Sequence, residues 1–131
     1  MNTQLTVIIP VFNEINSIEQ LLIKVLNNKI DKQIIVVDDH SSDGTRDLLI
    51  NKFKNKLNKI IFHQKNLGKG AAIKSAQKYI LGKYTIIQDA DLEYDPADYL
   101  TLVNEAEKNK FQAVYGSRVL NKNMHTNIKN F

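Results

Sequence analysis

The stretch Leu5-Thr-Val-Ile-Ile-Pro-Val-Phe12 is a near-continuous run of apolar, largely β-branched residues. A run of this kind, without alternating polar positions, is typical of a strand that is buried on both faces. Pro10 indicates that the strand ends at about that residue, because proline cannot donate to a sheet ladder. Residues 17–26 then carry apolar side chains at helical spacing. The order of strand, loop and helix is the beginning of an α/β fold.

Local signals place the ends of some predicted helices. Ser17 and Gln20, three residues apart, predict a capping box at the start of the first helix. Gly82 is predicted to end the helix that begins near residues 66–70. Asp95 and Pro96 predict a later helix, as N-cap and first-turn residue.

The same order of elements recurs along the chain. Further buried strands are predicted at residues 34–37, 59–62, 84–88 and 111–115. A helix is predicted after each of the first three, and the one after Ser41-Ser-Asp-Gly44 carries Leu48, Leu49 and Phe53 inward. Strands that alternate with helices predict a doubly wound, mainly parallel sheet with helices on both faces. Residues 1–118 are predicted to form this domain, and 119–131 an irregular tail.

Composition narrows the classes of protein and partner. The chain has 131 residues and no cysteine, which excludes disulfides and thiolate metal sites. Its apolar runs are too short to span a bilayer and no signal peptide is evident, so a cytoplasmic protein is expected, with a peripheral place at the membrane left open. The net charge is +4. The basic residues Lys52, Lys54, Lys56, Lys59 and Lys65 are interpreted as a solvated face, and no nucleic-acid partner is predicted.

Polar groups follow each predicted strand. These groups are Asn13-Glu14, Asp38-Asp39, Gly68-Lys-Gly70, Asp89-x-Asp91-x-Glu93 and Arg118. In a doubly wound sheet, ligands bind beyond the carboxyl ends of the strands. All five groups are therefore predicted to gather at one edge of the sheet.

The three carboxylates of Asp89, Asp91 and Glu93 predict a metal site. Oxygen ligands without histidine or cysteine suit a hard divalent ion, Mn²⁺ or Mg²⁺, which takes part of its shell from substrate phosphates. A polar turn, with Asp95 capping the next helix, is the alternative interpretation of the same stretch.

Asp38 and Asp39 could accept hydrogen bonds from a ribose or from a base N–H, or could cap the helix that follows. Gly68-Lys69-Gly70 matches neither phosphate-loop pattern, so we interpret it as a helix start with a lysine near the ligand. Arg118 is either a phosphate clamp or an ordinary surface arginine. Among the histidines, His40 is predicted near the pocket, whereas His63 and His125 are predicted on the surface.

Five motifs together resemble a known family. They are Val7-Ile-Ile-Pro-Val-Phe-Asn-Glu14, Ile35-Val-Val-Asp-Asp-His-Ser-Ser-Asp-Gly-Thr45, Asn66-Leu-Gly-Lys-Gly-Ala-Ala72, Gln88-Asp-Ala-Asp-Leu-Glu-Tyr-Asp-Pro96 and Gly116-Ser-Arg118. In order and spacing they resemble the family 2 glycosyltransferases of GT-A fold, with a Rossmann-like nucleotide-sugar-binding half. The branch that they resemble most includes dolichyl- and polyprenyl-phosphate sugar synthases. The resemblance implies inverting transfer from a nucleotide-diphosphate sugar, such as a UDP- or GDP-sugar.

The resemblance also implies roles for individual residues. Pro10, Phe12 and Glu14 would surround the base and ribose, with Asp39 reading the base edge. Asp91, with Asp89 and Glu93, would hold Mn²⁺ or Mg²⁺ against the diphosphate. The full set implied for nucleotide-sugar binding is Pro10, Phe12, Glu14, Asp38, Asp39, Lys69, Asp89, Ala90 and Arg118.

The chain departs from the family in length, because members normally continue for about as many residues again. The general base that a hydroxyl acceptor needs is expected downstream of Phe131. A polyprenyl phosphate is already an anionic nucleophile and could act without a base. The chain is thus predicted to be the donor half of a glycosyltransferase, and an exposed apolar face could drive homodimerisation.

Other functions remain open at this point. A non-catalytic nucleotide-sugar-binding module or inactive fragment would explain the missing acceptor half. A sugar-phosphate nucleotidyltransferase would need a glycine-rich basic loop after the first strand, and residues 10–14 offer none. A receiver-like signalling domain would place its acidic pair after the first strand rather than the second.

Overall fold

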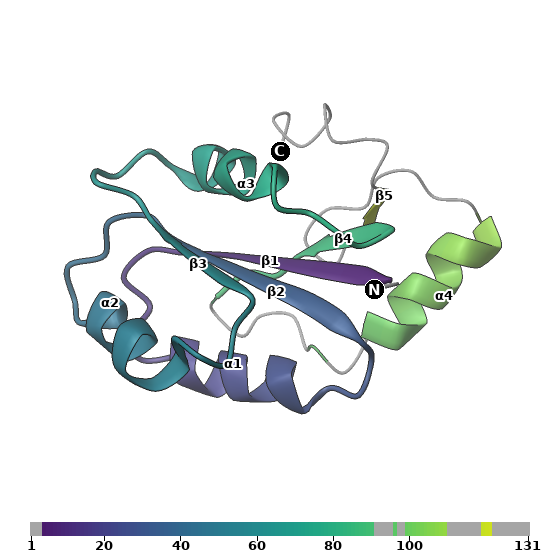
Figure 1. The fold of residues 1–131 in the computed structure, drawn as a ribbon, viewed down its shortest axis with the longest axis horizontal. Helices are drawn as coiled ribbons and strands as arrows, with labels where there is room; N and C mark the ends of the chain where they lie inside the picture. The colour runs from purple at the N-terminus through teal and green to yellow at the C-terminus, as the bar shows by residue number, and fades with distance from the viewer. Residues whose placement is uncertain (1–3, 91–95, 97–98, 110–118, 122–131) are drawn as a thin grey trace.

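The computed structural model describes residues 4–90, 96, 99–109 and 119–121, and Figure 1 shows their arrangement. In chain order the elements are β1 (Leu5–Val11), α1 (Ile18–Asn27), β2 (Lys32–Asp38), α2 (Thr45–Leu48), the π-helix η1 (Leu49–Phe53), β3 (Lys59–Phe62), α3 (Lys69–Gln77), β4 (Tyr84–Ile87), α4 (Tyr99–Asn109) and β5 (Val119–Asn121).

The strands form one sheet in the order β3-β2-β1-β4-β5. The first four are parallel, and β5 runs antiparallel to β4. The chain leaves the central strand β1 toward β2 and β3, and then returns to β4 on the other side of β1. The reversal occurs at the neighbouring strands β1 and β4, and doubly wound sheets bind ligands at such a topological switch point. The predicted fold, mainly parallel and doubly wound, is confirmed.

The core lies on both faces of the sheet. Val7 and Ile9 of β1 pack in a cluster with residues of α1, η1 and α4. Ile8, between them, packs with residues of α3 on the opposite face. Figure 1 shows α3 on one side of the sheet and α1 and α2 on the other. The central strands are apolar without alternation because each of their faces is covered by helices.

The carboxyl-terminal part of the chain differs from the prediction in one short strand. The strand predicted at 111–115 and the helix start predicted at Asp95 lie outside the described residues. Within the segment predicted to be an irregular tail, Val119–Asn121 form the short strand β5, paired with β4 from Ile86 to Tyr84. A three-residue strand is too short to produce a recognisable periodic pattern, and its pairing depends on β4.

The predicted capping box at Ser17 is wrong. Ser17 occupies the N-cap position of α1, but its side chain makes no capping hydrogen bond. The hydroxyl instead lies 2.7 Å from the carbonyl oxygen of Ala90 and 3.1 Å from Oε2 of Glu14. With a single proton it donates to one of these oxygens at a time. Ser17 therefore makes a tertiary contact to Ala90, which follows β4, in place of a hydrogen bond to the backbone of its own helix.

Gly82 does not end the preceding helix, because α3 stops at Gln77. Gly82 lies instead against the backbone of β1. A Cβ at this position would be 2.6 Å from the amide nitrogen of Thr6 and 2.7 Å from the carbonyl carbon of Leu5. The N–H of Gly82 donates to Oγ1 of Thr6 at 2.9 Å. Glycine is therefore required by close approach and not by helix termination.

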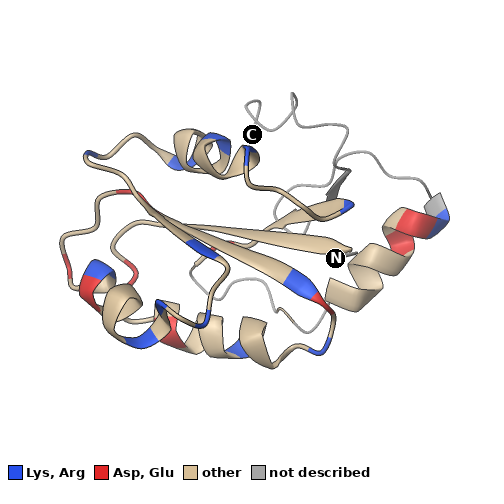
Figure 2. Cartoon of the chain, viewed as in Figure 1, with Lys and Arg blue, Asp and Glu red and all other residues tan. Residues whose placement is uncertain are grey.

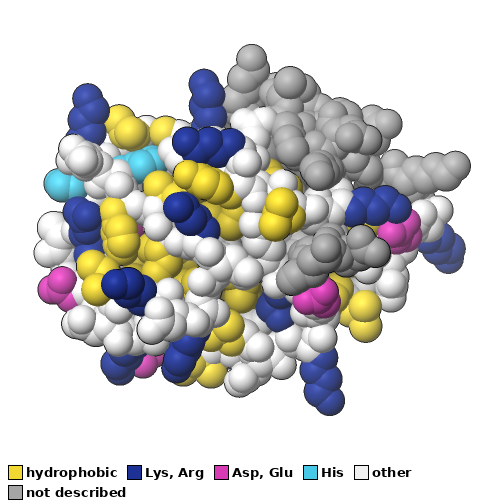
Figure 3. Space-filling view, viewed as in Figure 1, with side chains coloured by type: hydrophobic (Ala, Val, Ile, Leu, Met, Phe, Trp, Pro, Cys, Tyr) yellow, Lys and Arg dark blue, Asp and Glu magenta, His cyan; other side chains and the backbone are white. Residues whose placement is uncertain are grey.

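The helix after the second strand is a helical turn followed by a π-helix, α2 and η1. Leu49 and Phe53 are buried as predicted, and Leu48 is partly buried. The five lysines of the basic stretch are all exposed, which agrees with a solvated face. Figures 2 and 3 show Lys and Arg spread over this side of the molecule. No helix within the described residues is long and apolar enough to cross a membrane.

Candidate functional site

A pocket opens at the carboxyl ends of β1, β2 and β4, at the switch point of the sheet. The residues that line it are Pro10, Val11, Phe12, Glu14, Asp39, Lys69, Ala72, Asp89 and Ala90. Seven of them belong to the nucleotide-sugar set predicted from the sequence, although 79 positions separate Pro10 from Asp89 in the chain. The cavity is about 200 Å³. Pockets for drug-sized ligands start at roughly 300 Å³, so the cavity formed by the described residues is smaller than such a ligand needs.

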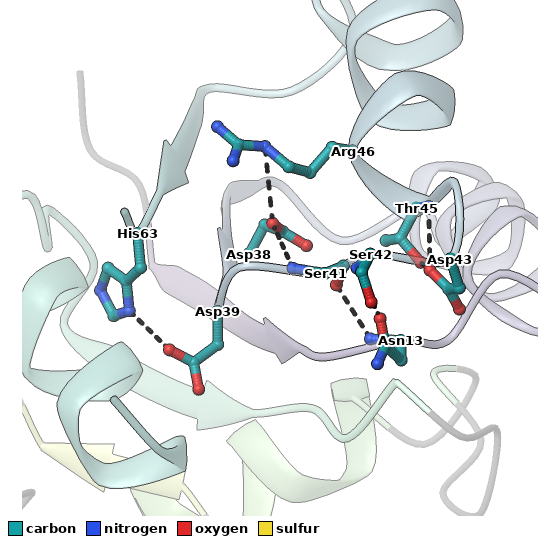
Figure 4. A network of polar contacts seen from close by, with 9 residues as sticks. All are labelled: Asn13, Asp38, Asp39, Ser41, Ser42, Asp43, Thr45, Arg46 and His63. Atoms are coloured by element: carbon teal, nitrogen blue, oxygen red, sulfur yellow. Dashed lines mark hydrogen bonds and ion pairs between the residues drawn. The ribbon is translucent and has the colours of Figure 1, made fainter. Parts of the chain in front are cut away.

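The Asp39 side chain makes three polar contacts with other described residues at the pocket. Its Oδ1 accepts the N–H of Leu67 at 2.8 Å and lies 2.8 Å from Nδ1 of His63. Its Oδ2 accepts the N–H of Gly68 at 2.8 Å. Gly68 has a φ of 97°, a conformation that favours glycine and that turns the loop before α3 toward the carboxylate. The contact with His63 is visible in Figure 4.

These contacts determine the charge of Asp39. Burial by itself would raise the pKa of the carboxyl group, since Asp39 is only 4% exposed. The N–H of Leu67, the imidazole of His63 and the N–H of Gly68 outweigh that effect, and the pKa of Asp39 lies below its ordinary value. Asp39 is therefore an anionic hydrogen-bond acceptor at neutral pH.

Asp38 is placed differently from Asp39. It is completely buried, does not line the pocket, and accepts the N–H of Ser41 through Oδ2 at 3.1 Å. The Nε atom of Arg46 lies 3.9 Å from the same oxygen, as Figure 4 shows. Within the residues that the structure describes, Oδ1 of Asp38 has no hydrogen-bond partner. These contacts shape the turn after β2. They do not cap α2, the alternative that the sequence left open, because the N–H of Thr45 at the start of that helix donates to Asp43 instead.

The loops after β1 and β2 are bonded to each other (Figure 4). The N–H of Asn13 donates to Oγ of Ser41, and the N–H of Ser42 donates to Oδ1 of Asn13, both at 2.8 Å. The N–H of Ile15 donates to Oδ2 of Asp43 at 3.1 Å. Asn13 has a φ of 52°, which asparagine tolerates better than most residues. The pocket wall between Phe12 and Glu14 is thus held against the second loop.

Lys69 and Asp89 form an ion pair on the wall of the pocket, with 2.5 Å between Nζ and Oδ1. Lys69 begins α3, and Asp89 follows β4. Next to Asp89, the buried Gln88 accepts the hydroxyl of Tyr99 from α4 at 2.6 Å. Contacts from the start of α3 and from α4 therefore hold Asp89 and its neighbour Gln88, which follow β4, in place beside the pocket.

The prediction that His63 lies on the surface is wrong. His63 is only 7% exposed, and its Nε2 lies 2.8 Å from Oγ of Ser75 on α3. His40 is exposed, has a φ of 67° and does not line the pocket, while His125 lies outside the described residues. His63 directly follows β3. Doubly wound sheets bind ligands beyond the carboxyl ends of their strands, so this position was a signal for a residue near the pocket. No signal in the sequence indicated Ser75.

Residues 6–130 match the family Glycosyl transferase family 2. The chain belongs to this family. Glycosyl transferase family 2 therefore accounts for nearly all of the chain, including the segments outside the described residues.

Curated relatives are longer than this family 2 chain. It is 33% identical over 132 residues to a dolichyl-phosphate beta-glucosyltransferase of Dictyostelium discoideum, covering 89% of this chain and 40% of the relative. It is 29% identical over 124 residues to a dodecaprenyl-phosphate galacturonate synthase of Rhizobium johnstonii, covering 88% and 36%. The chain thus spans about two fifths of the length of these curated relatives.

Solved structures of glycosyltransferases share the fold. S. aureus TarS in complex with UDP-GlcNAc aligns with a TM-score of 0.68 at 26% identity, over 85% of this chain and 32% of TarS. The mannosyltransferase PcManGT from Pyrobaculum calidifontis, in complex with GDP-Man and Mn²⁺, aligns with a TM-score of 0.67 at 26% identity, over 82% and 32%. The α/β sheet of this family 2 chain is therefore that of GT-A-like neighbours.

The predicted metal ligands are only partly within the described residues. Asp89 lines the pocket, whereas Asp91, Glu93 and the predicted phosphate clamp Arg118 lie outside the described part of the chain. Among the residues that the structure describes, no group of three His, Cys, Asp or Glu side chains could hold a metal ion. The chemistry of the donors in this family 2 chain still suits Mn²⁺ or Mg²⁺, because all three are carboxylates and one of them is at the pocket.

Proposed function

We propose that this chain is the donor-binding part of an inverting glycosyltransferase that uses a nucleotide-diphosphate sugar. The observation that carries the proposal is the pocket at the switch point of the sheet, lined by nine residues from four separate motifs. Family membership and the nucleotide-sugar complexes of TarS and PcManGT support it.

The base and ribose are assigned to the side of the pocket formed by β1 and β2. Phe12 is 46% exposed at the pocket and offers an aromatic face to a base. Asp39, anionic and buried, accepts an N–H from the edge of the base. Pro10 and Glu14 line the same side, and Glu14 is near the ribose in this proposal.

The diphosphate is assigned to the other side of the pocket, where Lys69, Asp89 and Ala90 lie. Asp89, Asp91 and Glu93 would hold Mn²⁺ or Mg²⁺. When bound, a divalent ion supplies Lewis-acid stabilisation of the charge that builds on the leaving diphosphate. Lys69 places a second positive charge on the same side, and Arg118 is proposed to reach the phosphates as well.

The proposed reaction is a direct displacement at the anomeric carbon. The acceptor oxygen forms its bond on the face opposite to the breaking bond between carbon and diphosphate oxygen, so the configuration inverts. We propose a polyprenyl phosphate as acceptor, because two of the curated relatives are named for lipid phosphates. An anionic phosphate oxygen can attack without a general base.

The test is calorimetric titration of the chain with UDP-glucose and GDP-mannose, each with and without Mn²⁺. Binding of at least one donor is expected to need Mn²⁺ and to be lost in Asp91→Ala. Asp31→Ala is the matched control, since Asp31 is an exposed carboxylate at the opposite edge of the sheet, before β2. Absence of binding under every condition, by a chain with an intact thermal transition, would contradict the proposal.

A non-catalytic nucleotide-sugar-binding module is the second candidate. It needs only the donor pocket that the described residues form. The two candidates differ in product: sugar transfer from the bound donor to a short-chain polyprenyl phosphate supports the enzyme, and donor binding without transfer supports the module.

A further inference from the structure

The segment from residue 48 to residue 88 carries lysines without any acidic residue. It contains nine lysines and no aspartate or glutamate, although the net charge of the whole chain is only +4. The segment includes β3, the strand at one edge of the sheet, and the helix α3. Figure 2 shows Lys and Arg but no Asp or Glu along α3. Any counter-charge for these lysines therefore comes from outside the segment.

A second pocket lies between α3 and β3. It is lined by Ile61 of β3 and by Lys74, Ser75, Lys78 and Tyr79, which belong to α3 or directly follow it. None of these described residues lines the donor pocket at the switch point. The volume is about 250 Å³. Because pockets for drug-sized ligands start at roughly 300 Å³, this second pocket, which we call the α3 pocket, suits a small chemical group.

Three lysines surround the α3 pocket. Lys59 and Lys78 contact the ring of Tyr79, with Nζ 4.7 Å and 5.3 Å from the ring centroid, and Lys74 lines the pocket itself. The negative face of an aromatic ring attracts an ammonium group, which keeps the two Nζ atoms close to Tyr79. Two positive charges beside the same ring repel each other, and an anion between them would remove that repulsion.

The three lysines have no carboxylate partner within the described part of the chain, since no ion pair there includes Lys59, Lys74 or Lys78. Other lysines of the segment do form ion pairs, which are Lys52 with Glu19, Lys69 with Asp89, and Lys83 with Glu107. The α3 pocket therefore combines unpaired cations with the apolar side chains of Ile61 and Tyr79. Apolar surroundings strengthen the attraction between a cation and an anion.

We propose that the α3 pocket binds a phosphoryl group, either as free phosphate or as part of a lipid headgroup. A phosphoryl group carries nearly two negative charges and three acceptor oxygens, which match three separate ammonium groups. A carboxylate has one charge and two oxygens in one plane, so it would leave a lysine unpaired. Lysine binds phosphate as a compact charge with three N–H donors. This site is separate from the proposed donor function and does not depend on it.

Ser75 provides a reporter for this site. Its hydroxyl lies 2.8 Å from Nε2 of His63, and Nδ1 of His63 lies 2.8 Å from Oδ1 of Asp39. Because Asp39 is anionic, Nδ1 carries the proton, and neutral His63 accepts the Ser75 hydroxyl through Nε2. Nε2 of His63 is thus one hydrogen bond away from the α3 pocket. Its nitrogen resonance is expected to move when an anion binds beside Ser75, and to move less in Ser75→Ala.

The experiment is an NMR titration of the isotope-labelled chain with inorganic phosphate, without divalent metal and at an ionic strength held constant with chloride. The amide resonances of Lys74, Ser75 and Lys78 are expected to move together along one saturable curve. The amides of Lys69 and Asp89 report on the donor pocket separately. A failure of the proposed donor function therefore leaves this test unaffected.

Lysine variants test the site. Lys74→Ala and Lys78→Ala are each expected to weaken phosphate binding at the α3 pocket by about threefold or more, as for loss of an exposed charge contact. Lys24→Ala is the matched control, because it removes the same charge from an exposed position on α1, across the sheet from α3. Its phosphate affinity is expected to equal that of the wild type.

Tyr79 variants test the aromatic ring. Tyr79→Leu removes the ring that Lys59 and Lys78 contact, and it is expected to weaken phosphate binding. Tyr79→Phe keeps the ring and is expected to bind phosphate as the wild type does. A urea transition of each variant separates loss of the site from loss of folding.

Sedimentation with phosphatidylcholine vesicles, prepared with and without phosphatidic acid, identifies the source of the phosphoryl group. Binding to the vesicles with phosphatidic acid that is weakened by Lys74→Ala and Lys78→Ala assigns a lipid headgroup. Saturable binding of free phosphate without binding to these vesicles assigns a soluble phosphate.

Two outcomes overturn the inference. One is the absence of saturable shifts at Lys74, Ser75 and Lys78 together with the absence of vesicle binding that depends on these lysines. The other is equal weakening by Lys24→Ala and Lys78→Ala, which would show general attraction to a positively charged chain instead of a site at α3.

Discussion

Nζ of Lys69 lies 2.5 Å from Oδ1 of Asp89, so the first residue of α3 is ion-paired with the residue that follows Gln88 after β4. The side chains are 39% and 32% exposed, and both line the pocket. A partly exposed pair of this kind contributes at most about 1 kcal/mol to folding. Because both side chains line the pocket, we expect them to matter more for ligand binding than for folding.

We therefore expect Lys69→Ala to weaken UDP binding by about tenfold, because a charged contact to the diphosphate is lost. The free energy of unfolding is expected to change by less than about 1 kcal/mol. Lys74→Ala, an exposed lysine on the same helix, is the control. Titrations with UDP and with uridine separate the two parts of the ligand, and a change in uridine affinity equal to that for UDP would contradict the assignment.

The Asp39 contacts also predict a dependence of stability on pH. A carboxyl group whose pKa is lowered by folding stabilises the native state above its unfolded pKa of about 3.9. This contribution disappears as the pH falls through the lower pKa of the folded protein. The difference in unfolding free energy between wild type and Asp39→Asn should therefore be largest above about pH 5 and shrink in acid.

Urea unfolding at a series of pH values measures this difference. Asp47→Asn, an exposed carboxylate on α2, serves as control and should change the unfolding free energy little. A gap between wild type and Asp39→Asn that is constant from neutral pH to about pH 2.5 would show that Asp39 does not gain from its contacts with Leu67, His63 and Gly68.

Gly82→Ala is expected to destabilise the protein by roughly 1–3 kcal/mol, because the new Cβ would overlap the backbone of Thr6 and Leu5. Gly70→Ala is the matched control. A Cβ there meets no atom within 4 Å, and alanine in α3 should stabilise by about 0.5–1 kcal/mol. Thermal or urea unfolding measures both, and equal effects of the two substitutions would rule out the close approach at Gly82.

Tyr99→Phe is expected to cost about 1–3 kcal/mol of unfolding free energy, because the buried oxygen of Gln88 loses the hydroxyl that donates to it at 2.6 Å. Tyr79→Phe, which keeps the ring that Lys59 contacts, is the control. Chemical unfolding gives the stability. Because Gln88 precedes Asp89, we also expect weaker Mn²⁺-dependent nucleotide binding by Tyr99→Phe. Unchanged binding would show that the hydrogen bond between Tyr99 and Gln88 contributes only to folding stability.

Local patterns predicted most of the scaffold. The apolar run of Leu5–Val11 correctly predicted a strand covered on both faces. The expectation that residues after the strands gather at one site holds for Glu14, Asp39 and Asp89, which line one pocket. The pattern failed for Val119–Asn121, where three residues are too few for a period. It also failed for Ser17, since a hydroxyl at a helix start can bond a carbonyl that is 73 positions away.

Local sequence patterns were enough to predict the alternation of strands and helices, the parallel sheet and the edge at which polar groups gather. Periodicity and strand-end position are local properties, so they can be read without knowing which segments touch. The difference between Asp39, which lines the pocket, and Asp38, which is buried beneath the turn, depends on the three-dimensional packing and was not predictable from the sequence. Only the tertiary structure brought His63 and Ser75 behind Asp39, because those contacts depend on the register of β3 against β2 and on the packing of α3 across the sheet.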